Sequence, residues 1–125
     1  MSVKMVSIFD EKYLVQGITA IESIIKCNQE VKVMIFALDE HTKIALESYF
    51  ESQIDVIDIR QTSELEVKFQ SLVKERKYSE AIFTLKSCCL SYLMKETPEN
   101  DWVVYFDADL FINTSTDLSR KALFI

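Results

Sequence analysis

Short hydrophobic runs alternate along the chain with longer stretches of helical spacing, and four of the runs are typical of β-strands. These runs cover residues 3–9, 31–38, 54–59 and 102–106. The second and the fourth, VKVMIFAL and WVVYF, contain almost only apolar side chains. Strands that are covered on both faces show this pattern, so the runs predict a parallel sheet buried between layers of helices.

The segment after the first run has the spacing of an amphipathic helix. Leu14, Ile18, Ile21 and Ile25 are separated by steps of four, three and four residues. This spacing places the four side chains on one face of a helix over residues 13–28. We expect that face to pack against the sheet.

Polar residues mark the starts of three further helices. Asp39 is suited to cap the second helix. Ser63 and Glu66 have the spacing of a capping box, which opens a third helix toward Arg76. Ser79 is suited to cap the fourth helix. The apolar residues assigned to the second and fourth helices are Ile44, Leu46, Tyr49, Phe50, Ile82, Leu85, Cys89 and Tyr92.

The order of these elements predicts the fold class. Strands and helices alternate, with two helices before the last strand, as in a doubly wound, Rossmann-like α/β fold with a mostly parallel sheet. A length of 125 residues predicts a single domain over residues 1–125. Because such sheets bind ligands at the carboxyl ends of their strands, we expect a site after Phe9, Leu38, Ile59 and Phe106.

Charge and composition exclude several classes of function. A net charge of −6, with acidic residues spread along the chain, offers no basic surface for nucleic acid. No apolar run approaches the roughly 20 residues that span a bilayer, and residues 1–10 lack the features of a signal peptide. We therefore expect a cytoplasmic protein without a membrane span. The single glycine, Gly17, leaves no glycine-rich phosphate loop, so a bound phosphate must be held by a metal and a cation.

The cysteines and the single histidine offer little chemistry. Cys27, Cys88 and Cys89 lack the C-x-x-C spacing of zinc and redox sites, so we expect free, mostly buried thiols. His41 lies in a polar stretch without a nucleophile pattern nearby. We expect it to be a solvated residue near a helix start.

Two carboxylates follow the fourth run as a D-x-D motif. In extended geometry Asp107 and Asp109 point to the same side of the chain. Paired carboxylates are hard oxygen ligands for Mg²⁺ or Mn²⁺, and such a cation completes its shell with waters and substrate phosphates. The motif alone is common by chance, but here it falls at a strand end where this fold class binds ligands. The alternative is that the two residues only end the strand and cap a turn.

The chain resembles a family of glycosyltransferases at these residues. Residues 78–93, followed by residues 102–109, are similar to the helix and D-x-D strand of family 8 and glycogenin-like enzymes, in which a lysine or arginine begins the helix that leads to a D-A-D strand. Residues 6–23 resemble their first strand and helix, including a Tyr-x-x-x-Gly spacing at Tyr13 and Gly17. The resemblance covers nearly the whole chain. It implies the N-terminal, donor-binding half of a GT-A nucleotide-diphospho-sugar transferase of hexosyltransferase type.

The resemblance implies roles for individual residues. Asp107 and Asp109 would bind Mn²⁺ or Mg²⁺, with Asp107 also near the donor ribose. Lys86 would lie against the donor diphosphate or sugar, and Lys86 and Asp109 are the expected catalytic residues. The residues implied to border the nucleotide base, with UDP favoured, are Phe9, Asp10 and Tyr13. Each role has a simpler alternative: a solvated helix lysine for Lys86, and packing for Tyr13.

The chain departs from the family beyond the D-x-D strand. Related enzymes continue into a second half that supplies the acceptor site and usually a histidine for the metal, whereas this sequence has no histidine after His41. We expect either a fragment of a longer protein or a truncated product with weak or absent activity. The apolar end, residues 123–125, predicts self-association or packing against a missing half.

Two other functions stay open. The first is a non-catalytic module that binds the donor or serves as an interaction piece. The second is a hydrolase of the haloacid dehalogenase type, in which one Asp of a D-x-D acts as nucleophile beside Mg²⁺. That motif usually follows the first strand, whereas here it follows the fourth run. A calcium loop is excluded, because Phe111 and Ile112 occupy positions that need a ligand and a glycine.

Overall fold

A four-stranded, entirely parallel sheet forms the centre of the protein in a computed structural model that describes residues 2–27 and 30–109. The strands lie in the order β3-β2-β1-β4. Their bounds are β1 (Val3–Phe9), β2 (Lys32–Ala37), β3 (Asp55–Asp58) and β4 (Trp102–Tyr105). All four predicted strands are confirmed to within one residue at each end. The predicted α/β class with a doubly wound sheet is confirmed as well.

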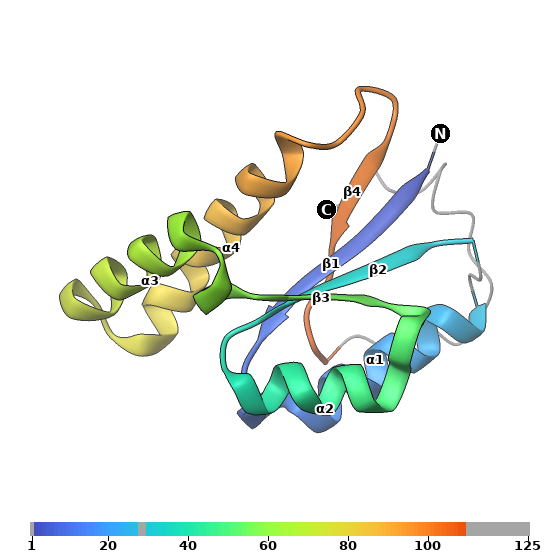
Figure 1. The fold of residues 1–125 in the computed structure, drawn as a ribbon, viewed down its shortest axis with the longest axis horizontal. Coiled ribbons are helices and arrows are strands. Elements are labelled where there is room, and N and C mark those ends of the chain that lie inside the picture. Colours follow the sequence, from blue (N-terminus) through green and yellow to red (C-terminus); the bar gives the residue numbers. More distant parts are fainter. Residues whose placement is uncertain (1, 28–29, 110–125) are drawn as a thin grey trace.

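Helices cover both faces of this sheet. Figure 1 shows α1 (Leu14–Cys27) and α2 (Glu40–Phe50) on one side, and α3 (Ser63–Glu75) and α4 (Tyr78–Met94) on the other. Each side has its own hydrophobic core, one built around Ile21, Ile35 and Leu46 and the other around Phe36, Leu65 and Leu85. Short 3-10 turns, η1 (Glu11–Tyr13), η2 (Glu51–Gln53) and η3 (Ile59–Gln61), connect the elements.

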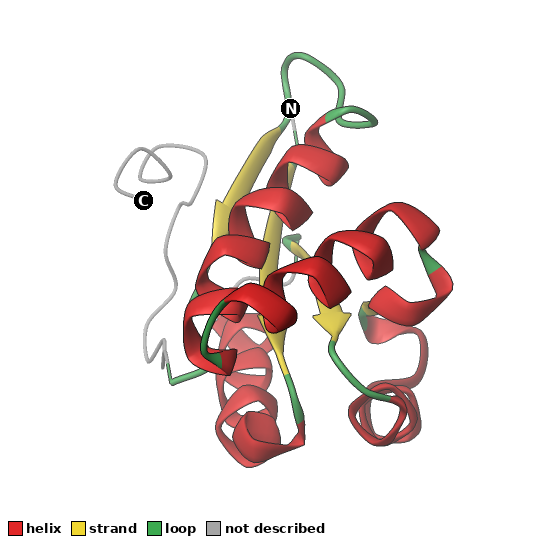
Figure 2. Cartoon of the chain, turned by 90° about the vertical axis from the view of Figure 1, so that its left-hand side faces the viewer, coloured by secondary structure: helices red, strands yellow, loops and turns green. Residues whose placement is uncertain are grey.

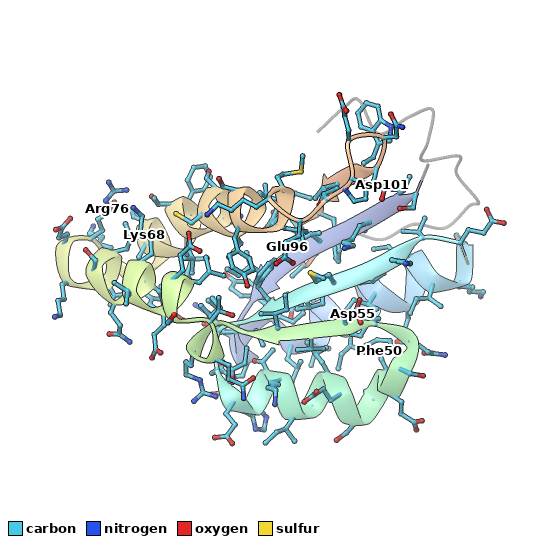
Figure 3. All side chains as sticks on the ribbon, turned by 45° about the horizontal axis from the view of Figure 1, so that its top comes forward. Phe50, Asp55, Lys68, Arg76, Glu96 and Asp101 are labelled. Carbon is cyan, nitrogen blue, oxygen red and sulfur yellow. The ribbon has the colours of Figure 1, made fainter. Side chains whose placement is uncertain are left out.

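The two ends of the sheet differ in what surrounds them. At the amino end, the loop from α4 to β4 lies beside the start of the chain, as Figure 2 shows. There the Ser2 amide donates a hydrogen bond of 2.9 Å to the Asp101 carboxylate, and Figure 3 labels Asp101 at this end. The carboxyl ends of the strands lie at the opposite end of the sheet. This edge is where the expected site residues fall.

Helix α1 packs on the sheet with a face that is rotated from the predicted one. Its buried residues are Gly17, Ala20, Ile21, Ser23 and Ile24, while Leu14, Ile18 and Ile25 are only partly buried. The small residues allow a close approach to β1: a Cβ atom at Gly17 would overlap the ring of Phe9. The spacing of the large apolar residues could not predict this face, because it takes no account of small residues.

The predicted caps divide into one that is confirmed and two that are wrong. Asp39 caps α2, because its side chain accepts a hydrogen bond from the Thr42 amide. The capping box of Ser63 and Glu66 does not form, since α3 begins at Ser63 itself and its N-cap residue, Thr62, makes no side-chain cap hydrogen bond. Ser79 does not cap α4, which already begins at Tyr78.

The buried faces of the other helices agree in part with the prediction. In α2, Leu46 and Phe50 are buried, but Ile44 and Tyr49 are exposed, and Thr42 takes an inner position instead. In α4, the buried residues are Ala81, Leu85, Cys89 and Leu93, with Ile82 and Tyr92 partly buried against the same core. Cys89 is buried, Cys27 and Cys88 are partly buried, and none of the three forms a disulfide bond.

Three further expectations concern His41, membrane spans and the apolar end of the chain. His41 is exposed in the first turn of α2, with its Nε2 atom 3.8 Å from the Glu11 carboxylate. Among residues 2–27 and 30–109, no helix has both the length and the apolar character needed to cross a membrane. The predicted apolar end at residues 123–125 lies outside the described residues.

Candidate functional site

A pocket of about 450 Å³ lies at the carboxyl ends of β1 and β4, against one side of α4. Its volume is within the range of small-molecule sites in proteins. It is lined by Ile8, Phe9, Asp10, Tyr13, Gln16, Ser79, Ile82, Phe83, Lys86, Tyr105, Asp107, Ala108 and Asp109. The pocket thus brings together all six residues that the sequence singled out, from three separate segments of the chain.

The β1 wall of the pocket is built on Asp10. One oxygen of its carboxylate accepts a 3.0 Å hydrogen bond from the Lys12 amide, which caps η1 and fixes the turn that carries Tyr13. The other oxygen accepts a 3.0 Å bond from the Tyr78 hydroxyl at the start of α4. Asp10 therefore links the β1 turn to the helix that forms the opposite wall.

The Tyr78 hydroxyl that donates this bond is hard to ionise. Burial, and next the hydrogen bond to the Asp10 carboxylate, raise the pKa of Tyr78 well above its ordinary value. The hydroxyl consequently keeps its proton at neutral pH. The Tyr78 hydroxyl therefore remains a hydrogen-bond donor to Asp10 over the physiological pH range.

Phe9 and Tyr13 contribute to the pocket in different ways. Phe9 is only 3% exposed, and its ring packs against Gly17 on α1. Tyr13 is about half exposed, and the Lys12 ammonium lies 5.9 Å from the centre of its ring. Tyr13 is therefore the aromatic face that a ligand can reach from the β1 side, and Phe9 supports the wall behind it.

Asp39, which follows β2, uses both of its carboxylate oxygens to accept hydrogen bonds from backbone amides. Its two oxygens accept bonds of 2.7 Å from the Thr42 amide and 3.1 Å from the Glu11 amide. Burial alone raises the pKa of Asp39, but these bonds outweigh it and lower the pKa below its ordinary value. Asp39 joins the start of α2 to the β1 turn and does not line the pocket.

Both carboxylate oxygens of Asp58, at the end of β3, also accept hydrogen bonds from a nearby residue. It is 3% exposed and forms a bidentate pair with Arg60, with distances of 3.1 Å and 2.7 Å, besides accepting a bond from the Arg60 amide. The hydrogen bonds from the Arg60 side chain lower the pKa of Asp58, against the opposing effect of burial. The charged groups at this strand end therefore pair with each other.

The β4 wall carries carboxylates of a different kind. The side chain of Asp107 is 68% exposed, and Asp109 is exposed as well. Within the part of the chain that the structure describes, neither accepts a hydrogen bond from a backbone amide. Both residues line the pocket.

Lys86 of α4 is the cation of the pocket. Its Nζ atom lies 3.5 Å from Asp107 Oδ1 and is close to two rings, 5.1 Å from the centre of Tyr105 and 5.5 Å from that of Phe83. Burial alone lowers the pKa of Lys86, but attraction to Tyr105 and Asp107 outweighs it and raises the pKa above its ordinary value. The amine is therefore fully charged at neutral pH.

The donor set at the end of β4 fits a hard divalent cation with open coordination positions. Mg²⁺ and Mn²⁺ accept carboxylate oxygens, and Mg²⁺ is commonly held by one or two carboxylates together with waters and phosphates. Across residues 2–27 and 30–109, no three His, Cys, Asp or Glu side chains gather as a closed metal site. Asp107 and Asp109 would thus hold such an ion only in part.

The sequence did not single out several residues of the pocket. Phe83 is 73% exposed at the rim, and Tyr105 lies under Lys86. A local signal for Phe83 existed, because residues three apart on a helix are neighbours and Phe83 precedes Lys86 by three. Tyr78 could not be found in this way, since its partner is 68 residues away.

Comparisons with known proteins give limited further information. No protein-family model matches the chain. YfnF of Bacillus subtilis (strain 168), described as an uncharacterized protein, is 28% identical over 99 residues, which is 78% of this chain. The matched region makes up 32% of YfnF, so the chain spans about a third of the length of that relative. The pocket is therefore the feature from which function is inferred.

Proposed function

We propose that the chain is the donor-binding part of a metal-dependent glycosyltransferase of the GT-A type, with a UDP-sugar as donor. One observation carries the proposal: two exposed carboxylates and a charged lysine meet in one pocket at the carboxyl edge of a parallel sheet. Ligands of such sheets bind at this edge. A divalent cation and a fixed positive charge can together hold a nucleoside diphosphate without a glycine-rich loop.

Each wall of the pocket has a task in this proposal. Asp107 and Asp109 hold Mn²⁺ or Mg²⁺, which neutralises charge on the donor diphosphate when bound. Lys86 stabilises the negative charge that develops on the departing diphosphate, because the Phe83 and Tyr105 rings keep its ammonium in the pocket. Tyr13 offers its exposed face to the nucleotide base.

The transfer step itself needs an acceptor site. The chain spans about a third of YfnF, and the acceptor site is proposed to lie in a part of a longer protein that corresponds to the remainder. A donor-binding module without turnover is the alternative function. Sugar transfer or slow hydrolysis of the donor separates the enzyme from this module, and release of phosphate from simple phosphomonoesters would instead indicate a hydrolase.

The test is calorimetric titration of the 125-residue chain with UDP, with and without Mn²⁺. We expect saturable binding that requires Mn²⁺ and is lost in Asp109→Ala. The matched control is Asp55→Ala, which removes an exposed carboxylate at the amino end of β3 (Figure 3) and should leave binding unchanged. Absence of UDP binding to the folded chain in the presence of Mn²⁺ would overturn the proposal.

A further inference from the structure

The contact between Lys86 and Asp107 bears on how a metal ion and a nucleotide bind together in the pocket. This inference rests on the proposed function. Lys86 Nζ lies 3.5 Å from Asp107 Oδ1. The lysine therefore already occupies one side of a carboxylate that is expected to bind the metal. A cation and a metal ion that share one carboxylate compete with each other.

The lysine is held in this position by more than the carboxylate. Its side chain is 28% exposed and its ammonium lies near both the Phe83 and the Tyr105 ring. A fully hydrated lysine would move away when a divalent ion approaches, at little cost in free energy. Lys86 gives up its contacts with the rings and with Asp107 if it moves, so it opposes the incoming charge.

We propose that Lys86 acts as a gate on the metal site, so that it weakens metal binding until a diphosphate draws its ammonium away from Asp107. A diphosphate offers several anionic oxygens to the ammonium, whereas Asp107 offers one oxygen at 3.5 Å. Once Lys86 turns to the phosphates, its repulsion of the metal falls. Nucleotide and metal then bind with positive coupling, and by linkage each raises the affinity of the other by the same factor.

One substitution in the pocket is expected to strengthen metal binding instead of weakening it. Lys86→Met keeps much of the apolar stem but removes the charge, so Mn²⁺ alone should bind more tightly than to the wild type. Two positive groups a few ångströms apart at a solvated site repel each other enough to change the affinity roughly tenfold at low salt. The factor by which UDP strengthens Mn²⁺ binding should fall by the same amount, although the part that arises from phosphate coordination remains.

The first experiment measures Mn²⁺ alone, through loss of the electron paramagnetic resonance signal of the free ion. Lys86→Arg keeps the charge and should stay within about twofold of the wild type, because the Coulomb term is unchanged. Lys95→Met is the matched control, since it breaks another lysine–carboxylate pair on α4's C-terminal side, with Glu64 at 3.0 Å, and removes the same charge. Circular dichroism and thermal melting confirm that each variant is folded.

The second experiment titrates UDP at several Mn²⁺ concentrations, with correction for the complex that forms in solution. The outcomes separate the two proposals. Tighter binding of Mn²⁺ to Lys86→Met supports the gate, even if the wild type fails to bind UDP and the donor proposal fails. Equal or weaker binding of Mn²⁺ to Lys86→Met overturns the gate, even if the wild type binds UDP with Mn²⁺. Failure of both proteins to bind Mn²⁺ alone overturns the gate, whereas the donor proposal is decided by UDP binding in the presence of Mn²⁺.

Discussion

An aspartate stands at or just after the carboxyl end of each of the four strands that the structure describes, and these aspartates differ in what they do. Asp10, Asp39 and Asp58 each accept a hydrogen bond from a backbone amide and cap the element that follows. Asp107 has the same relation to its strand, but its described contact is a 3.5 Å pair with a lysine. Position at a strand end therefore does not identify a candidate ligand-binding carboxylate. Hydrogen bonds to local backbone amides distinguish the three caps from Asp107.

The strongest test of this comparison removes the carboxylates after β4. Asp107→Ala combined with Asp109→Ala should weaken Mn²⁺-dependent UDP binding by at least about a hundredfold, because the metal loses its protein ligands. The free energy of unfolding should change by no more than about 0.5 kcal/mol, as for other exposed residues. Calorimetry and urea unfolding measure the two quantities. A variant that loses stability instead would place these residues with the caps.

The opposite result is expected at the end of β3. Arg60→Met leaves the 3% exposed Asp58 carboxylate without its bidentate partner. We expect a loss of about 2 kcal/mol in the free energy of unfolding, less than for a fully buried pair because the Arg60 side chain is partly exposed. Urea unfolding gives the value. Arg76→Met, at an exposed arginine bonded to Thr84, is the control that should change little.

A smaller loss is expected for the aspartate that joins two elements. Asp39→Ala removes the hydrogen bonds to the Thr42 and Glu11 amides, which should cost about 1.5 kcal/mol of stability. Asp39→Asn keeps an acceptor for one of these amides and should recover part of the loss. Thermal unfolding of the three proteins checks the order. An unchanged Asp39→Ala melting midpoint would contradict the proposed role of this residue as a cap.

The smallest expected effect is on the stability of the protein at acidic pH. The pKa of Asp58 is lower in the folded protein than in the unfolded chain, so its contribution is present above about pH 4 and is lost as the pH falls through the folded pKa. The stability difference between the wild type and Arg60→Met should therefore shrink below about pH 4. Urea unfolding at neutral and acidic pH measures this difference. A gap that stays constant would show that the pair does not shift the titration of Asp58.

The sheet could be predicted from the sequence because its signal is local. Each strand is a short apolar run, and all four appear where the runs predicted them. The helix faces were harder, since the closest packing uses small residues. Gly17 and Ala20 lie at the inner side of α1, where the Phe9 ring fills the space next to the glycine. A search for large apolar residues misses such a face.

The site was predicted as a set of residues but not as a set of contacts. The D-x-D motif, the lysine helix and the β1 turn do meet in one pocket. The contacts that hold the walls together, such as the bond from Tyr78 to Asp10, join residues far apart in the sequence. Ser79 does not cap α4, because the helix already begins at Tyr78.

The strand order has a consequence for the way the protein is made. During synthesis, β1, β2 and β3 leave the ribosome within the first half of the chain and can pair with their neighbours at once. β4 joins β1 only after α3 and α4 have been made, and it closes a contact between residues 99 positions apart. The pocket is consequently the last part of this sheet to assemble, so a nascent chain cannot bind a ligand there until its framework exists.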